Sequence, residues 1–183
     1  MKVLKFGGSS VGTAERIKNV ANLVQERRGN ILVLSAMSGN TNALVSISNN
    51  KSIEEVQALK DKVSKELYDL ISNSEIVSRG IAFLDKEFDA IETLLVGENE
   101  NGIVAKGEII STQFMSYYME EIGVKHQLLD STKYLKLDES GEADIAYIKN
   151  ATKEIDQEDT IYIMQGFICS DVRGNISNLS RGG

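Results

Sequence analysis

The sequence predicts an α/β fold built around a mainly parallel sheet, and three observations lead to this prediction. Two apolar runs, residues 3–6 and 31–35, each end in a turn of small residues that leads into a helical pattern. A strand, a turn and a helix repeated in this way indicate parallel strands joined by right-handed crossovers. A further apolar run, 160–164, also ends in a glycine-containing turn. Because ligands of such sheets bind beyond the carboxyl ends of the strands, we expect a functional site at these turns.

The first element, residues 1–12, reads as a strand, a glycine turn and the start of a helix. We expect the helix to run from Val11 to about Arg28, because its apolar residues recur at i, i+3, i+4 and i+7. Glycine N–H groups beside a helix N-terminus form an anion-binding geometry, and Lys5 stands directly before Gly7 and Gly8. The spacing fits neither a Walker P-loop nor a dinucleotide fingerprint. From the residues alone, two interpretations of Lys5 are equally supported: it binds a phosphate group, or it is a solvated lysine at the end of a strand.

The second unit is a buried strand at 31–35, the turn 36–40 and a helix that begins near Thr41 or Asn42. Capping and turn chemistry is the simpler interpretation of Ser35 and Thr41. Residues 49–97 read as two amphipathic helices with a break near 72–74 or around Gly80.

The second half continues the pattern, with a loop at 98–102 and then a helix at 104–122. Glu108 falls in or near the first turn of that helix, where a carboxylate is favourable to the helix dipole in any case. His126, the one histidine, reads as structural or exposed. The other expected elements are strands at 125–129, 134–137 and 160–164, a helix ending near 155, and a hairpin around 172–176 with Gly174 and Asn175 in its turn.

Composition excludes several classes of function. The 183 residues are enough for one domain with a proper core. A net charge of −7, with no basic cluster larger than Arg27–Arg28, argues against a nucleic-acid partner. We expect no membrane partner, because no apolar run approaches the roughly 18 residues of a span. We expect no signal peptide, because the segment after Met1 reads as a strand and has no cleavage-like site. The lone cysteine, Cys169, suits a reducing cytoplasm, and a single Cys with a single His excludes a zinc site, so we predict no metal ligands.

Four motifs, in order, resemble those of aspartokinases in the amino acid kinase superfamily. They are KFGGSSVG at 5–12, LSAMSGNTN at 34–42, KGE at 106–108 and QGF…SRGG at 165–183. The resemblance covers the whole chain, and the four motifs together are far more specific than any one of them. It implies the amino acid kinase fold, a three-layer αβα sandwich with a mainly parallel sheet, and a helical insertion at about 49–97.

The resemblance also implies a reaction: transfer of the γ-phosphoryl group of ATP to the side-chain carboxylate of L-aspartate. The product is 4-phospho-L-aspartate, the first intermediate of lysine, threonine and methionine biosynthesis. ATP would be the co-substrate, with Mg²⁺, in the cytoplasm. The residues implied for catalysis and for the nucleotide phosphates are Lys5, with the N–H groups of Gly7, Gly8 and Ser9. The residues implied for aspartate are Ser35, Thr41, Glu108 for the ammonium group, and Arg181 for a carboxylate.

The last residues depart from the family pattern. Members usually read TTLGRGGSD and continue, whereas this chain has Ser177-Asn178 for the two threonines and Ser180 for a glycine. We therefore expect residues 1–183 to be the N-terminal, aspartate-binding part of a kinase domain, truncated before the C-terminal nucleotide-binding part and without regulatory domains.

We expect the fragment alone to be inactive and the full-length enzyme to form a homo-oligomer. The alternatives are an inactive substrate-binding module, or another amino acid kinase such as a glutamate or acetylglutamate kinase. The feedback inhibitor and any fusion to a homoserine dehydrogenase stay open.

Overall fold

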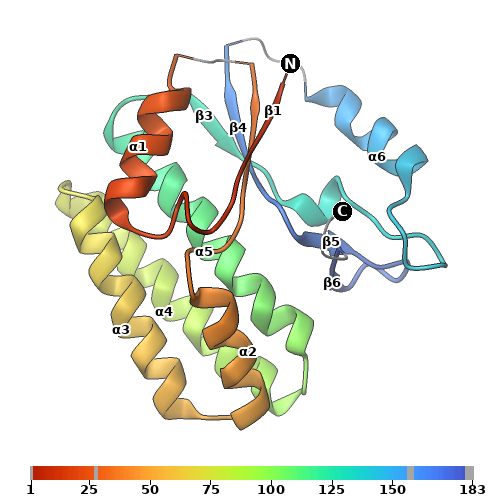
Figure 1. The fold of residues 1–183 in the computed structure, drawn as a ribbon, viewed down its shortest axis with the longest axis horizontal. Coiled ribbons are helices and arrows are strands. Elements are labelled where there is room, and N and C mark those ends of the chain that lie inside the picture. The colour runs from red at the N-terminus through yellow and green to blue at the C-terminus, as the bar shows by residue number, and fades with distance from the viewer. Residues whose placement is uncertain (1, 27–28, 156–158, 180–183) are drawn as a thin grey trace.

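The four-stranded sheet of this protein is parallel, which confirms the predicted α/β fold with a mainly parallel sheet. The structure is a computed structural model that describes residues 2–26, 29–155 and 159–179. Its four-stranded sheet has the order β1 (Val3–Phe6), β2 (Ile31–Leu34), β4 (Ile161–Gln165) and β3 (His126–Leu128). Each neighbouring pair runs parallel, and the strands form the centre of the molecule in Figure 1.

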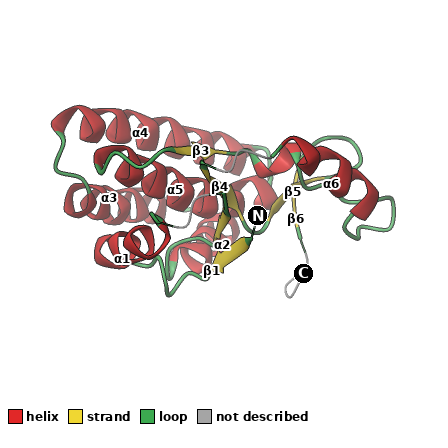
Figure 2. Ribbon diagram, turned by 90° about the horizontal axis from the view of Figure 1, so that it is seen from above, coloured by secondary structure: helices red, strands yellow, loops and turns green. Residues whose placement is uncertain are grey.

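Helices make up most of the remainder. They are α1 (Ala14–Val24), α2 (Asn40–Asn50), α3 (Ile53–Leu70), α4 (Ser74–Val96), α5 (Glu100–Glu121) and α6 (Ile145–Ala151), with 3-10 turns at Ser131–Lys133 and Thr152–Glu154. Strands β5 (Ile168–Ser170) and β6 (Ile176–Asn178) form the expected antiparallel hairpin. Figure 2 shows α1 to α5 gathered on one side of the sheet and α6 with the hairpin on the other. None of the helices in the described ranges is long and apolar enough to cross a membrane.

Alternate residues of β4 enter two separate cores. Ile161 and Ile163 belong to the larger core, on the side of α1 to α5. Tyr162 and Met164 belong to a smaller core that includes Ile155. A strand that is buried on both faces explains the continuous apolar run in the sequence. Both faces of the sheet are therefore covered at β4, whereas Val3 and Lys5 on one face of the edge strand β1 are exposed.

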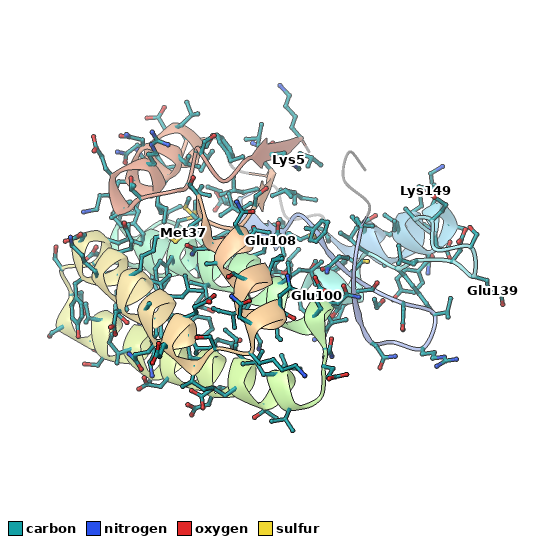
Figure 3. The ribbon with its side chains drawn as sticks, turned by 60° about the horizontal axis from the view of Figure 1, so that its bottom comes forward. Lys5, Met37, Glu100, Glu108, Glu139 and Lys149 are labelled. Atoms are coloured by element: carbon teal, nitrogen blue, oxygen red, sulfur yellow. The ribbon has the colours of Figure 1, made fainter. Side chains whose placement is uncertain are left out.

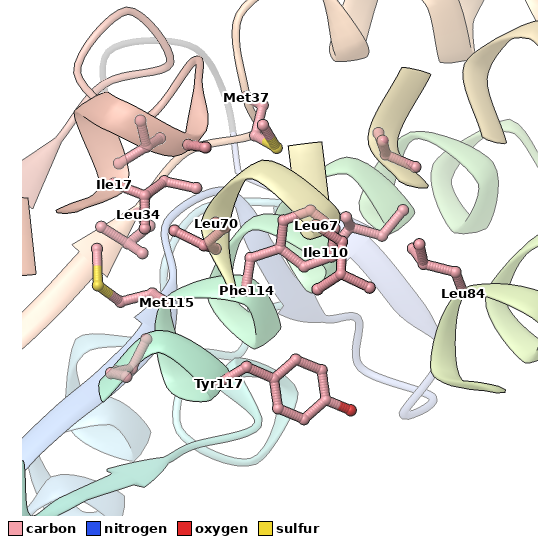
Figure 4. Close-up of a cluster of buried hydrophobic side chains, with 14 of the residues drawn as sticks. Ile17, Leu34, Met37, Leu67, Leu70, Leu84, Ile110, Phe114, Met115 and Tyr117 are labelled. Carbon is pink, nitrogen blue, oxygen red and sulfur yellow. The ribbon is translucent and has the colours of Figure 1, made fainter. Parts of the chain in front are cut away.

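The larger core centres on α5. Phe114 and Met115 of this helix are fully buried, together with Ile17 of α1, Leu34 of β2 and Leu67 of α3 (Figure 4). Full burial of one such side chain contributes about 1.5–3 kcal/mol to folding. The core thus fixes α5 against the sheet, which matters because α5 carries a predicted site residue.

Two helices begin at positions that differ from the expected ones. Helix α1 begins at Ala14 rather than Val11, because the Thr13 hydroxyl caps it by accepting the N–H of Arg16. Helix α5 begins at Glu100 rather than near 104, because the Asn99 side chain accepts the N–H of Gly102. The interpretation of Glu108 as a first-turn residue is therefore wrong, since Glu108 lies more than two turns inside α5.

Two other expectations are resolved by packing. The break between α3 and α4 falls at 71–73, and Gly80 lies inside α4. A Cβ atom at Gly80 would lie 2.6 Å from Leu67 Cδ2, so glycine there permits the close approach of α3. The strand expected at 134–137 is wrong: this segment follows a 3-10 turn and makes only isolated bridges, such as Lys136 with Ser170.

Candidate active site

The carboxyl ends of three strands meet at one edge of the sheet. Phe6 pairs with Leu34, and Leu34 pairs with Gln165, so β1, β2 and β4 end side by side. The turns that follow these strands are therefore neighbours in space, although they are far apart in the sequence.

A cavity of about 650 Å³ opens at this edge, a volume typical of small-molecule sites. Its lining includes four predicted site residues: Lys5, Ser35, Thr41 and Glu108. The other lining residues are Ala36, Asn42, Val45, Glu100, Asn101, Val104, Gly166, Phe167, Asn178 and Leu179. Figure 3 shows Lys5, Glu108 and Glu100 in the same part of the molecule. A cation and an anion that are 103 residues apart thus face one space.

Glu108 is the most perturbed acid of this cavity. The residue is only 6% exposed, and the N–H of Phe167 donates to its Oε2 atom at 2.6 Å. Burial raises the pKa of Glu108 to about 7, while backbone N–H groups and the positive charge of Lys5 act in the opposite direction. The group is therefore balanced between its two protonation states near neutral pH, and a cationic ligand would favour the carboxylate.

Helix α5 brings Glu108 to the end of β2 through very close packing. A Cβ atom at Gly107 would lie 2.9 Å from Ala36 Cβ and 3.1 Å from Leu44 Cδ1. The Ser111 hydroxyl donates to the carbonyl oxygen of Ser35 at 2.9 Å. Glycine in the KGE motif thus permits the approach that places Glu108 beside Ser35.

The loops after β1 and β2 touch without intervening side chains. A Cβ atom at Gly8 would lie 2.6 Å from the carbonyl oxygen of Ala36, and one at Gly12 would lie 2.8 Å from Ser38 Cβ. Gly8 and Gly12 therefore serve packing between the loops. Gly7, Gly8 and Ser9 follow Lys5 but are not among the described residues that line the cavity.

One N–H group at the start of α1 is already bonded within the protein, so it is unavailable to an anion. The N–H of Ala14 donates to Glu66 Oε2 at 2.7 Å, and residues 7–13 separate β1 from the helix. The segment between the strand and the helix is therefore longer than expected, and one N–H group of the helix start is bonded to a carboxylate. An anion at this edge would have to use the N–H groups of the loop itself.

Residues outside the cavity have structural contacts. His126 pairs through Nε2 with the Ser116 hydroxyl and through Nδ1 with the carbonyl oxygen of Val124, each at 2.8 Å. Lys106, beside Glu108 in sequence, forms an ion pair with Glu87 of α4 at 2.6 Å, and both side chains are largely buried. Burial also raises the pKa of Cys169 to about 11, which keeps the thiol protonated and unreactive. Arg181 lies outside the described residues.

Two features of the cavity lining could not be found by sequence reasoning. One is the backbone N–H of Phe167, which donates to Glu108. The QGF motif predicts a turn at this position, but a backbone donor cannot be recognised from the type of side chain. The other is the contact between Asn178 of β6 and Asn101 of α5, in which the Asn178 amide donates at 3.0 Å. Asn101 falls in a stretch that reads as a loop, so only its helical setting shows that it faces the cavity.

Comparisons with known proteins agree with this geometry. A sequence model of the amino acid kinase family matches residues 1–183. An aspartokinase of Chlamydia trachomatis is 30% identical over 99% of this chain, which corresponds to 43% of that protein. Chloroplastic aspartokinase 2 of Arabidopsis thaliana is also 30% identical over 99% of this chain, and 37% of that protein is covered. The chain therefore spans about two-fifths of the length of these relatives.

Solved structures show the same fold. Aspartokinase III of E. coli in complex with lysine and aspartate superposes with a TM-score of 0.83 and 26% identity, covering all of this chain and 44% of that one. The same enzyme in complex with aspartate and ADP superposes with a TM-score of 0.78 at the same coverage.

Proposed function

This chain belongs to the amino acid kinase family, and on that basis we propose that it forms the aspartate-binding part of an aspartokinase. The reaction would transfer the γ-phosphoryl group of ATP to the side-chain carboxylate of L-aspartate, which begins lysine, threonine and methionine biosynthesis. The names of the relatives support this, as does the complex of E. coli aspartokinase III with aspartate. The observation that carries the proposal is that Lys5 and the buried Glu108 line one cavity at the strand ends.

The chemistry requires charge stabilisation rather than a base. A side-chain carboxylate with a pKa near 3.9 is already ionised at neutral pH, so no residue has to remove a proton from it. The barrier comes from bringing this anion to a polyphosphate, and positioned cations lower it. Lys5, held by β1 at the sheet edge, is the group that would bind the transferring phosphoryl oxygens. The N–H groups of Gly7, Gly8 and Ser9 would assist it.

The amino acid would be recognised by groups of opposite charge and by hydroxyls. The carboxylate of Glu108 matches the ammonium group of aspartate, and the cation would stabilise the ionised form of this buried acid. Ser35, which follows β2, and Thr41, in the first turn of α2, supply hydroxyl groups to the cavity. Arg181 is the proposed partner of a substrate carboxylate.

ATP would bind with its Mg²⁺. The described residues contain no group of three or more His, Cys, Asp or Glu side chains arranged to hold a metal ion. We propose that the cation is held mainly by phosphate oxygens and water, which is the usual mode for Mg²⁺. We further propose that α3 and α4 form a helical insertion in the kinase domain, and that the complete enzyme is a cytoplasmic homo-oligomer.

The test is steady-state kinetics of the protein with its complete coding sequence. We expect Glu108→Gln to raise the KM for aspartate far more than the KM for ATP, because only the amino acid carries an ammonium group. We expect Lys5→Ala to lower kcat by about 10²–10³-fold. Lys2→Ala is the matched control, since Lys2 is exposed near the start of the same strand and is not among the lining residues.

Two outcomes would contradict this assignment. Equal changes in the two KM values would remove Glu108 from the ammonium site, and near-normal turnover of Lys5→Ala would remove Lys5 from catalysis. Glutamate and acetylglutamate are assayed beside aspartate, and a clear preference for either would favour another amino acid kinase.

A further inference from the structure

Two side chains of α3, one helical turn apart, hold both loops that border the cavity. Lys62 Nζ donates to the carbonyl oxygen of Ser38 at 3.2 Å and to Asn40 Oδ1 at 2.8 Å. Glu66 Oε2 accepts the N–H of Ala14 at 2.7 Å. We propose that Lys62 and Glu66 are positioning residues for the phosphoryl transfer, an inference that rests on the function proposed above. Lys62 would fix the position of residues 38–40, beside the proposed amino-acid site. Glu66 would fix the end of loop 7–13, beside the proposed phosphate site.

The contact of Lys62 is not explained by stabilisation of α2. Asn40 is the first residue of α2, and its cap, Gly39, has no side chain to bond the helix end. A cation at a helix N-terminus opposes the helix dipole, so Lys62 is electrostatically unfavourable for α2 as a helix. What Lys62 fixes is the path of residues 38–40. The next residue, Thr41, lines the cavity, so a shift of this loop moves a proposed substrate contact.

Glu66 determines where the first loop ends. Its carboxylate bonds the first N–H of α1, an electrostatically favourable position for an anion. The Thr13 cap by itself supplies one bond, to the N–H of Arg16 at 3.4 Å. Loop 7–13 is therefore held at one end by β1, which carries Lys5, and at the other by Glu66. Loss of the carboxylate would remove the bond to Ala14 and loosen this end, although the buried Val11 and the Arg16 guanidinium, which donates to the Ser9 carbonyl oxygen, would still hold the loop.

The two loops act as one unit because their backbones are in contact. Gly8 packs against the carbonyl oxygen of Ala36, and Gly12 packs against Ser38, with no space for a side chain between them. Helix α3 itself is anchored by a buried apolar stripe of Val56, Leu59, Val63, Leu67 and Leu70. Lys62 and Glu66 are not among the described residues that line the cavity, so their effect on substrates must pass through the loops.

Kinetics of single variants separate this role from a general loss of structure. We expect Lys62→Ala to raise the KM for the acceptor amino acid about three- to tenfold while the KM for ATP stays within about twofold. The effect is smaller than the two lost bonds would give by direct contact, because Lys62 acts on the acceptor only through the loop. We expect Glu66→Ala to raise the KM for ATP and lower kcat instead. Lys62→Arg should restore most of the loss, because arginine donates to the same oxygens. Lys65→Ala and Glu54→Ala, at exposed positions of α3, are the charge-matched controls.

The proposal is overturned if Lys62→Ala behaves like Lys65→Ala, if both KM values rise together, or if Lys62→Arg is as impaired as Lys62→Ala. Hydrogen exchange of the ligand-free protein gives a readout that does not depend on the reaction. We expect faster exchange at 38–41 in Lys62→Ala and at the Ala14 amide in Glu66→Ala. If the protein has no kinase activity but hydrogen exchange becomes faster in the two variants as expected, the proposed function alone is refuted. If hydrogen exchange in both variants is the same as in the wild type, the positioning role is refuted.

Discussion

Replacement of Glu108 by glutamine is expected to change how the free energy of unfolding depends on pH. The pKa of this carboxyl is about 7 in the folded protein, against 4.5 as its ordinary value, and burial is the main cause. Between these two pH values the folded protein keeps a proton that the unfolded chain releases. The contribution of Glu108 to stability is therefore complete below about pH 4.5 and is lost as the pH rises through about 7. At about 1.4 kcal/mol for each pH unit between the two pKa values, the loss is about 3 kcal/mol.

Urea unfolding of the wild type and of Glu108→Gln, at intervals between about pH 5 and pH 8, measures this effect. Glutamine does not ionise, so the variant should gain about 3 kcal/mol relative to the wild type as the pH rises. Glu100→Gln, at an exposed glutamate of the same helix and cavity, is the control for the loss of one negative charge. Parallel profiles for Glu108→Gln would refute the reasoning that a buried carboxylate is destabilising here.

Three further predictions follow from the same contacts. On the proposed function, the affinity for aspartate should rise with pH between about 6 and 8, because an ammonium group beside Glu108 favours the ionised carboxylate. Calorimetry in buffers of different protonation enthalpy should detect the released proton, and an affinity independent of pH would contradict this. Gly107→Ala should lower the melting temperature, because overpacking against Ala36 and Leu44 costs about 1–3 kcal/mol against a helix-propensity gain of about 1 kcal/mol. Gly97→Ala, where the nearest atom lies 3.8 Å from the new Cβ, is its control, and equal effects would count against the packing argument. Lys106→Met alone should cost about 3–5 kcal/mol by leaving Glu87 buried and unpaired, whereas Lys106→Met with Glu87→Leu should cost much less; additive losses in chemical denaturation would show that the two residues are not coupled.

The strands and their ends could be predicted from the sequence because the signal is local. The apolar runs at 3–6, 31–35 and 160–164 are each followed by a turn of small residues or one that contains glycine, and each forms a strand that ends at the cavity. The parallel arrangement followed from the repeated strand, turn and helix. The placing of Lys5 and Glu108 in one space needed the family motifs, because nothing local relates them.

The starts of α1 and α5 could not be predicted, since caps at Thr13 and Asn99 compete with several neighbouring polar residues that look equally suitable. The contacts of Lys62 and Glu66 join residues 22 to 52 positions apart, and no periodic pattern reports them. The raised pKa of Glu108 likewise depends on burial by several elements at once. These features arise only when the chain has folded.

The interior position of Glu108 in α5 has a consequence for selectivity. A carboxylate on a loop can shift to meet a longer or shorter substrate, but this one projects from a helix that Gly107 seats directly on Ala36. The opposite charge, Lys5, projects from a strand of the same rigid framework. Glu108 therefore fixes where the ammonium end of an acceptor would lie, and on the proposed function an acceptor one methylene longer should lose about tenfold or more in kcat/KM. To move this carboxylate, the protein would have to shift the whole helix α5, because exchange of a single residue elsewhere in the cavity lining would leave Glu108 in place.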